Sequence, residues 1–188
     1  MLDPDVIAKY IDRARSLYAN QHSREHAYRP ALEQLMLRAG NIEAINDPAQ
    51  SEHGAPDFIF LQLDNPDIVL GYAEAKDVGI DLSKVEESDQ MHRYAGYQNL
   101  FLTDYLEFRF YANGELYETI RIGAVQDGKL HGLPGNYQRF AELIEQFLSK
   151  PPQSIASGKR LAEIMGAKAR RIRDDIIAYF SEEPSDTE

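Results

Sequence analysis

Residues 56–63, PDFIFLQL, and residues 68–76, IVLGYAEAK, decide the fold that this sequence predicts. Both runs are rich in aromatic and aliphatic side chains, and both have the length of strands rather than helices. The polar segment between them, Asp64–Asp67, contains a proline and favours a turn. We therefore expect two antiparallel strands, Asp57–Leu63 and Ile68–Lys76, joined as a hairpin.

The charged residues of this hairpin gather at one of its ends. Side chains alternate along a strand, so Glu74 and Lys76 project from the same face. When the hairpin closes at its turn, Asp57 lies near the strand end that carries Glu74. Two carboxylates suit Mg²⁺, and a neighbouring lysine can orient or deprotonate water and stabilise charge on a phosphate. These residue types serve metal-dependent phosphodiester hydrolysis, although a solvated strand edge with a cross-strand ion pair has the same pattern.

Helices and further strands flank the hairpin. Asp3 and Pro4 open a first helix, and a second is expected over Ser23–Ala39, kinked or split at Pro30. Later elements are expected as a helix around Lys84–Tyr94, strands at Asn99–Thr103, Glu107–Tyr111 and Leu116–Ile122 with a turn at Asn113-Gly114, and a helix at Tyr137–Leu148. This order predicts an α/β fold with a mixed central β-sheet flanked by helices.

The proline pair Pro151-Pro152 marks a candidate internal boundary. Residues 1–150 are long enough for one domain with a sizeable core. Residues 151–188 are expected to form a helical connector or extension that ends in a frayed acidic tail. A basic helix over Lys159–Phe180 could contact phosphates, although a solvated or docking face is the favoured interpretation.

Composition excludes several classes of protein. The chain has no cysteine, which removes disulfides, thiolate nucleophiles and cysteine-ligated zinc. No apolar run reaches the roughly 18–20 residues of a membrane span, and the acidic start does not resemble a secretion signal. We therefore expect a cytoplasmic protein with no membrane partner. The 20 Lys and Arg residues against 31 Asp and Glu give a net charge of −11, which argues against tight nucleic-acid binding over the whole surface.

Five short motifs follow one another in a specific order. They are Gly54–Phe58, Gly71–Asp77, Asp81-Leu82, Gln90–Tyr94 and Leu102–Phe108. Together they resemble the N-terminal nuclease domain of large single-chain restriction–modification enzymes, the type ISP and type IIG-like group within the PD-(D/E)XK superfamily. The resemblance is strong over roughly residues 23–111 and weaker beyond them. It implies a restriction-endonuclease-like core and a Mg²⁺-dependent DNA endonuclease, with Mn²⁺ able to replace Mg²⁺.

The resemblance also implies a role for each motif residue. Asp57 and Glu74 would bind the metal, and Lys76 would act on the attacking water. Glu25 matches a helix glutamate that often joins such sites, although an acidic residue early in a helix is also favoured by the helix dipole. Gln90 and Tyr94 match a Q-x-x-x-Y element that supports the site or contacts DNA, although Gln90 could face solvent and Tyr94 could belong to the core.

The partners of such a domain lie elsewhere in the enzymes that it resembles. Sequence recognition, adenine methylation and, in type ISP enzymes, ATP-driven translocation belong to other domains. This sequence contains neither the methyltransferase motif N/D-P-P-Y/F nor a helicase phosphate loop. We therefore expect a fragment of a larger protein or a stand-alone relative. The expected partners are DNA, bound weakly and without sequence specificity, the methyltransferase, target-recognition and helicase domains, and a second copy on DNA.

Two other functions stay open at this point. The same fold could be a catalytically inactive docking or DNA-binding module, although the complete set of Asp57, Glu74 and Lys76 argues against it. A nuclease for RNA or branched DNA would share the chemistry, and these residues do not select between the substrates.

Overall fold

The computed structural model describes residues 2–20, 23–51, 53–149 and, further along, residues 165, 166, 169, 170, 173, 176 and 177. The chain divides into two units, Met1–Pro152 and Gln153–Glu188. The predicted helix Lys159–Phe180 and the predicted frayed tail lie largely outside the described residues, and those described in the second unit are helical. The two-domain assignment, 1–150 and 151–188, stays a prediction. Within the described ranges, no helix is long and apolar enough to cross a membrane.

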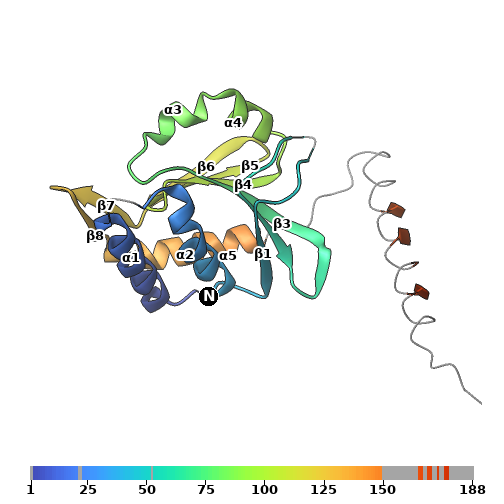
Figure 1. Cartoon of the computed structure of the whole chain (residues 1–188), viewed down its shortest axis with the longest axis horizontal. Helices are drawn as coiled ribbons and strands as arrows, with labels where there is room; N and C mark the ends of the chain where they lie inside the picture. Colours follow the sequence, from blue (N-terminus) through green and yellow to red (C-terminus); the bar gives the residue numbers. More distant parts are fainter. Residues whose placement is uncertain are drawn as a thin grey trace, which may run out of the picture. The chain divides into compact units, whose positions relative to one another are not determined.

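A six-stranded mixed sheet forms the centre of the first unit (Figure 1). In spatial order its strands are β1 (Ile42–Asn46), β2 (Phe58–Gln62), β3 (Asn65–Ala75), β4 (Asn99–Thr103), β5 (Glu107–Ala112) and β6 (Glu115–Arg121). Strands β3 and β4 are parallel, and all other neighbours are antiparallel. The predicted mixed sheet is confirmed.

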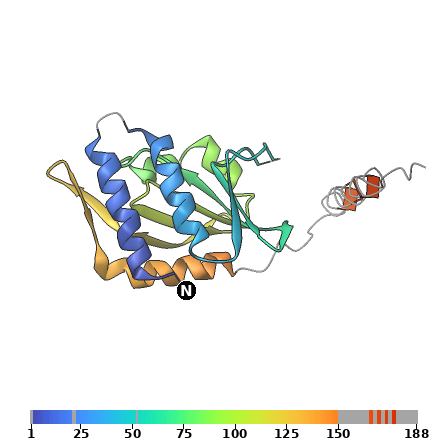
Figure 2. The same cartoon turned by 60° about the horizontal axis from the view of Figure 1, so that its bottom comes forward.

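Helices cover both faces of this sheet. Figure 1 shows α3 (Leu82–Glu86) and α4 (Asp89–Tyr94) on one side, and α1 (Pro4–Ala19), α2 (Glu25–Leu37) and α5 (Tyr137–Leu148) on the other. In Figure 2 the blue helices α1 and α2 run side by side over the sheet. The strands alternate accordingly: Phe60 and Phe101 join the core with α1, α2 and α5, whereas Leu100 packs with α3 and α4.

The predicted helices at the chain start are found, and of the two outcomes expected at Pro30, a kink or a split, the split does not occur. Asp3 caps α1 as predicted, because its Oδ1 accepts a 2.8 Å hydrogen bond from the amide of Asp5. Pro30 does not split the second helix, and α2 runs continuously through it. Pro30 and His26, four residues earlier, are both exposed. Water can therefore replace the hydrogen bond that the missing proline amide would have made.

The central hairpin is also confirmed, with a different turn. Gln62 pairs with Asn65, so Leu63 and Asp64 form the turn instead of Asp64–Asp67. Pro66 therefore lies inside β3. It is tolerated there because β4 pairs with β3 only from Tyr72 onwards, so the other side of β3 is an edge at Pro66.

The crossover between β3 and β4 holds two helices in place of the predicted helix Lys84–Tyr94. Asp81 caps α3 and Ser88 caps α4, and each side chain accepts a backbone amide hydrogen bond. Two successive capping residues interrupt what the apolar pattern alone presents as one helix.

Three strands were not predicted. They are the edge strand β1 and the pair β7 (Gly123–Gln126) and β8 (Lys129–Gly132), which form a separate hairpin. Strand β8 packs against α1, where Arg15 Nε donates to the carbonyl of Leu130 over 3.1 Å. A short 3₁₀ turn, η1 (Pro134–Asn136), then leads into α5.

Candidate functional site

The end of the β2–β3 hairpin places Asp57 beside Glu74. Phe58 pairs with Ala73, so Asp57, the residue before β2, lies across from Glu74. Asp57 Oδ2 accepts a 2.8 Å hydrogen bond from the backbone N–H of Ala75, which fixes its carboxylate against the end of β3. Glu74 is only 3% exposed, and Asp57 is half-buried. The two predicted carboxylates therefore share one strand end.

Lys76 and Gln90 surround the carboxylate of Glu74. Lys76 Nζ lies 2.5 Å from Glu74 Oε1, and Gln90 Nε2 donates to the same oxygen over 2.9 Å. Gln90 Oε1 accepts from Lys76 Nζ over 3.2 Å, so one amide holds both members of the ion pair. Tyr94 OH lies 3.0 Å from Gln90 Nε2 and donates to the carbonyl of Ala55 over 2.7 Å. Gln90 and Tyr94 thus act from adjacent turns of α4.

Glu25 reaches the site through Arg29. Arg29 Nη2 donates to Glu25 Oε1 over 2.9 Å and also to Asp57 Oδ1. The two residues are one turn apart on α2, which packs on the opposite face of the sheet from α4. The carboxylates of Glu25 and Asp57 therefore share one guanidinium. Helices from both layers contribute to the cluster.

The start of α2 is held against the strand ends from two sides. Asp77 Oδ1, directly after the Glu74–Lys76 segment, accepts from the backbone N–H of Glu25 over 2.6 Å. The hydroxyl of the fully buried Tyr105 donates to the carbonyl of Glu25 over 2.9 Å. These bonds fix the distance between α2 and the end of β3, and with it the position of Arg29.

The carboxylates of this cluster disfavour one another's charge. Burial raises the pKa of Asp57, and the nearby Glu25 adds to that rise, while the Ala75 amide and the Arg29 guanidinium oppose it. Burial also raises the pKa of Glu74, and the negative charge of Asp57 adds to the rise against the opposing effect of Lys76. A cation bound between Asp57 and Glu74 would relieve this repulsion.

The donor atoms fit a hard divalent cation. Glu74 Oε2 is buried and finds no hydrogen-bond partner among the described residues, although a buried carboxylate oxygen is normally paired. Its neighbour across the strand end, Asp57, offers further oxygen donors, and oxygen ligands are those that Mg²⁺ prefers. In the part of the chain that the structure describes, no three His, Cys, Asp or Glu side chains already group as a complete metal site. Asp57 and Glu74 are therefore the residues that would hold such an ion.

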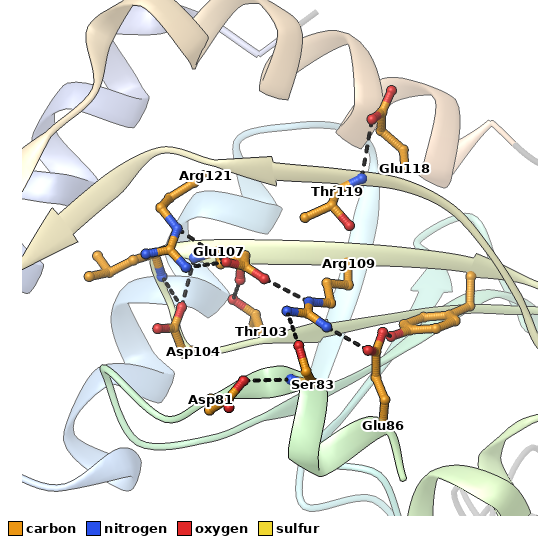
Figure 3. Close-up of polar contacts among 12 residues, drawn as sticks. Asp81, Ser83, Glu86, Thr103, Asp104, Glu107, Arg109, Glu118, Thr119 and Arg121 are labelled. Atoms are coloured by element: carbon orange, nitrogen blue, oxygen red, sulfur yellow. Dashed lines mark hydrogen bonds and ion pairs between the residues drawn. The ribbon is translucent and has the colours of Figure 1, made fainter.

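A charged network anchors α3 to the sheet (Figure 3). Glu86 of α3 accepts from Arg109 Nη1 over 2.5 Å through Oε2 and from the hydroxyl of Tyr111 through Oε1. Arg109 Nε in turn donates to Glu107 Oε1 over 2.6 Å, and Arg121 Nε donates to Glu107 Oε2 over 3.1 Å. Strands β5 and β6 thus hold α3, the helix directly before α4, which carries Gln90.

An open hollow adjoins Lys76 and Gln90. Its volume is about 440 Å³, and its lining residues are Lys76, Ile80, Asp81, Lys84, Val85, Ser88 and Gln90. Ile80 is 47% exposed, and the side chain of Lys84 is 84% exposed. The hollow therefore offers an apolar surface and an exposed cation, Lys84, beside the polar cluster.

Comparison with known proteins identifies a fold but no family. No family model matches this chain, and no curated protein matches it. A cryo-EM structure of a DrdV–DNA complex matches with a TM-score of 0.61 and 19% sequence identity. The match covers 80% of this chain and 14% of the chain in that complex. This chain shares its fold with part of a protein that was solved bound to DNA.

Two side-chain roles at the site were not anticipated from the sequence. Arg29 was not singled out as functional, yet it joins Glu25 to Asp57. Glu86 lies in none of the five sequence motifs, yet it anchors α3 to the sheet. The available signal for Arg29 was its spacing of four residues from Glu25, which places both on one helix face.

Proposed function

We propose that this chain is a Mg²⁺-dependent endodeoxyribonuclease module with a PD-(D/E)XK core, like the N-terminal domain of type ISP and type IIG-like restriction–modification enzymes. The observation that carries the proposal is the convergence of Asp57, Glu74 and Lys76 on one strand end. The buried, unpaired oxygen of Glu74 supports a cation at this place.

The carboxylates and the lysine take separate roles in this proposal. Asp57 and Glu74 would hold Mg²⁺, which supplies a Lewis acid for phosphate oxygens and lowers the pKa of bound water. Lys76 has three ammonium N–H donors, two of which are directed at Glu74 and Gln90. The third can donate to the attacking water or to a phosphate oxygen.

Lys76 therefore orients water and stabilises phosphate charge instead of abstracting a proton. An ammonium that donates to Glu74 has no lone pair with which to accept one. Gln90 holds the lysine in place because its carbonyl oxygen accepts from Nζ while its amide nitrogen donates to Glu74. The sequence allowed three roles for Lys76: orienting water, deprotonating water and stabilising phosphate charge. The proposed role combines the first and the third.

The hollow beside Lys76 gives the DNA backbone a path to the site. The exposed ammonium of Lys84 can contact a phosphate next to the one that is cut, and Ile80 can pack against a deoxyribose. The fold shared with a protein solved on DNA supports a DNA substrate. Sequence recognition would come from methyltransferase, target-recognition or helicase domains of a longer protein, and two copies on DNA would cut both strands.

The test is nicking of supercoiled plasmid by the full chain in millimolar Mg²⁺ or Mn²⁺. We expect slow cleavage without sequence preference by the wild type. Asp57→Asn and Lys76→Met should each reduce the rate about a hundredfold or more, as expected for loss of a metal ligand or of an oriented cation at the phosphate. The matched control Asp127→Asn, at the turn between β7 and β8, should cut at the wild-type rate. Cleavage by both site variants at the control rate would refute the assignment.

The pairing within the cluster favours a second candidate function, an inactive docking or DNA-binding module. Arg29 already neutralises Asp57, and Lys76 already neutralises Glu74, so both carboxylates have a counter-charge without a metal. A structural module of either kind would take up neither Mg²⁺ nor Mn²⁺ at millimolar concentration. Calorimetric titration with Mn²⁺ separates the two functions.

A further inference from the structure

Arg29 is a buried cation inside the carboxylate cluster. The residue is only 8% exposed, and its Nη2 contacts both Glu25 Oε1 and Asp57 Oδ1. Its Nη1 donates to Asn46 Oδ1, at the end of β1, over 3.2 Å. The guanidinium therefore lies where the start of α2 meets the end of β1 and the residue before β2.

This pairing is incomplete on both sides. Arg29 Nε is buried and finds no partner among the described residues, and the same is true of Glu74 Oε2. Leaving a buried donor and a buried acceptor unpaired costs free energy. A divalent cation would pair with Glu74 Oε2, and a phosphate oxygen of a substrate could accept from Arg29 Nε.

Both oxygens of Asp57 are already engaged. Oδ1 accepts from Arg29, and Oδ2 accepts from the amide of Ala75. A divalent cation that binds Asp57 and Glu74 must therefore displace the guanidinium from Oδ1 or bind next to its positive charge. Either event weakens binding of the cation.

We propose that Arg29 neutralises Asp57 in the metal-free protein and lowers the affinity of the site for a divalent cation. This inference rests on the proposed function, because it concerns the same metal site. A substrate phosphate carries negative charge, and the planar guanidinium is suited to bind it. Once the metal releases Arg29 from Asp57, the guanidinium would pair with the substrate phosphate. Metal and substrate would therefore bind to the site together.

The test is calorimetric titration of the full chain with Mn²⁺ in the absence of DNA. Arg29→Gln should bind Mn²⁺ about tenfold or more tightly than the wild type, because the positive charge that contacts Asp57 is removed. The matched control is Arg38→Gln, an exposed arginine at the other end of the same helix. It removes the same charge from the protein and should keep the affinity within about twofold, since exposed distant charges are screened. Circular dichroism establishes that each variant is folded.

The outcomes separate this inference from the proposed function. Equal Mn²⁺ affinities of the wild type and Arg29→Gln would overturn the role of Arg29 and leave the metal site standing. Absence of binding by all three proteins would contradict the metal site and the role of Arg29 together. If Arg38→Gln gained as much Mn²⁺ affinity as Arg29→Gln, the gain would come from the change in net charge alone. That outcome would also overturn the inference.

A measurement on the wild type covers the case in which Arg29→Gln does not fold. The Arg29 Nε–H resonance should shift during a Mg²⁺ titration followed by nuclear magnetic resonance, and it should saturate together with metal binding. An unchanged Arg29 resonance at metal saturation would overturn the inference.

Discussion

Glu74 is more deeply buried than Asp57 or Glu25, and its single paired oxygen is held by residues from two elements. The sequence predicted that Glu74 and Lys76 project from one face, because side chains alternate along an extended chain with a period of two. The pairing of Arg29 with Asp57 could not be predicted from the sequence. It depends on how the start of α2 packs against the strand ends, and no local pattern specifies that packing.

A first prediction concerns Gln90, which contacts both Glu74 and Lys76. Gln90→Ala removes both hydrogen bonds and should slow plasmid cleavage about tenfold, corresponding to about 1.4 kcal/mol of lost positioning. Rates are measured under single-turnover conditions. Gln34→Ala, an exposed glutamine on α2, is the matched control and should leave the rate unchanged. Equal rates for the two variants would show that Gln90 does not position the lysine.

At the scale of elements, the sequence predicted the central hairpin and the three strands after it, because long apolar runs and the Asn113-Gly114 turn mark them. Strand β1 was missed because it is short and mostly exposed, so it lacks a clear alternation. The β7–β8 hairpin was missed although Asp127-Gly128, both with positive φ, is a strong turn signal. Each of its strands has only four residues.

The anchoring of α3 gives the second prediction. Glu86→Ala removes the acceptor for Arg109 and Tyr111 and should lower the free energy of unfolding by about 1–3 kcal/mol. Hydrogen exchange should become faster in α3 and α4 and stay slow in the central strands. The neighbouring Glu87 is exposed, so Glu87→Ala is the control and should change neither quantity. Uniformly faster exchange across the whole sheet would contradict a local anchoring role.

The link between β5 and β6 gives a third prediction, on pH. Burial would raise the pKa of Glu107, but hydrogen bonds from Arg121 and Arg109 outweigh it and hold the pKa below its ordinary value of 4.5. The Glu107 carboxylate therefore stabilises the fold above that value, and this contribution is lost as the pH falls through the lowered pKa. Urea unfolding between neutral and acidic pH should show a smaller loss of stability for Glu107→Gln than for the wild type. An identical pH profile for the two proteins would exclude this role of Glu107.

At the scale of the whole molecule, the net charge of −11 has to be reconciled with the proposed DNA substrate. Part of the negative charge belongs to the cluster of Glu25, Asp57 and Glu74, where we propose that a divalent cation binds. The remainder repels the DNA backbone. In the proposed function, other domains of a longer protein would supply the DNA affinity. This chain spans 14% of the chain in the DrdV–DNA complex, with part of which it shares its fold.

The fourth prediction is weak binding of DNA by this chain alone. Without divalent cations, its dissociation constant for duplex DNA should be about 10 μM or weaker at physiological salt, within the range of non-specific binding. Fluorescence anisotropy of a labelled duplex measures it, and affinity should fall further as salt is added. Nanomolar affinity at physiological salt would contradict the charge argument.

The central claim is that Asp57 and Glu74 hold a divalent cation at the end of the β2–β3 hairpin. Its most direct test is calorimetric titration with Mn²⁺ of the wild type and of Glu74→Gln, which keeps the size of the side chain and its contact with the amide of Gln90. We predict saturable binding by the wild type in the millimolar range and no saturable binding by Glu74→Gln. Equal binding by the two proteins, or none by the wild type, would contradict the account.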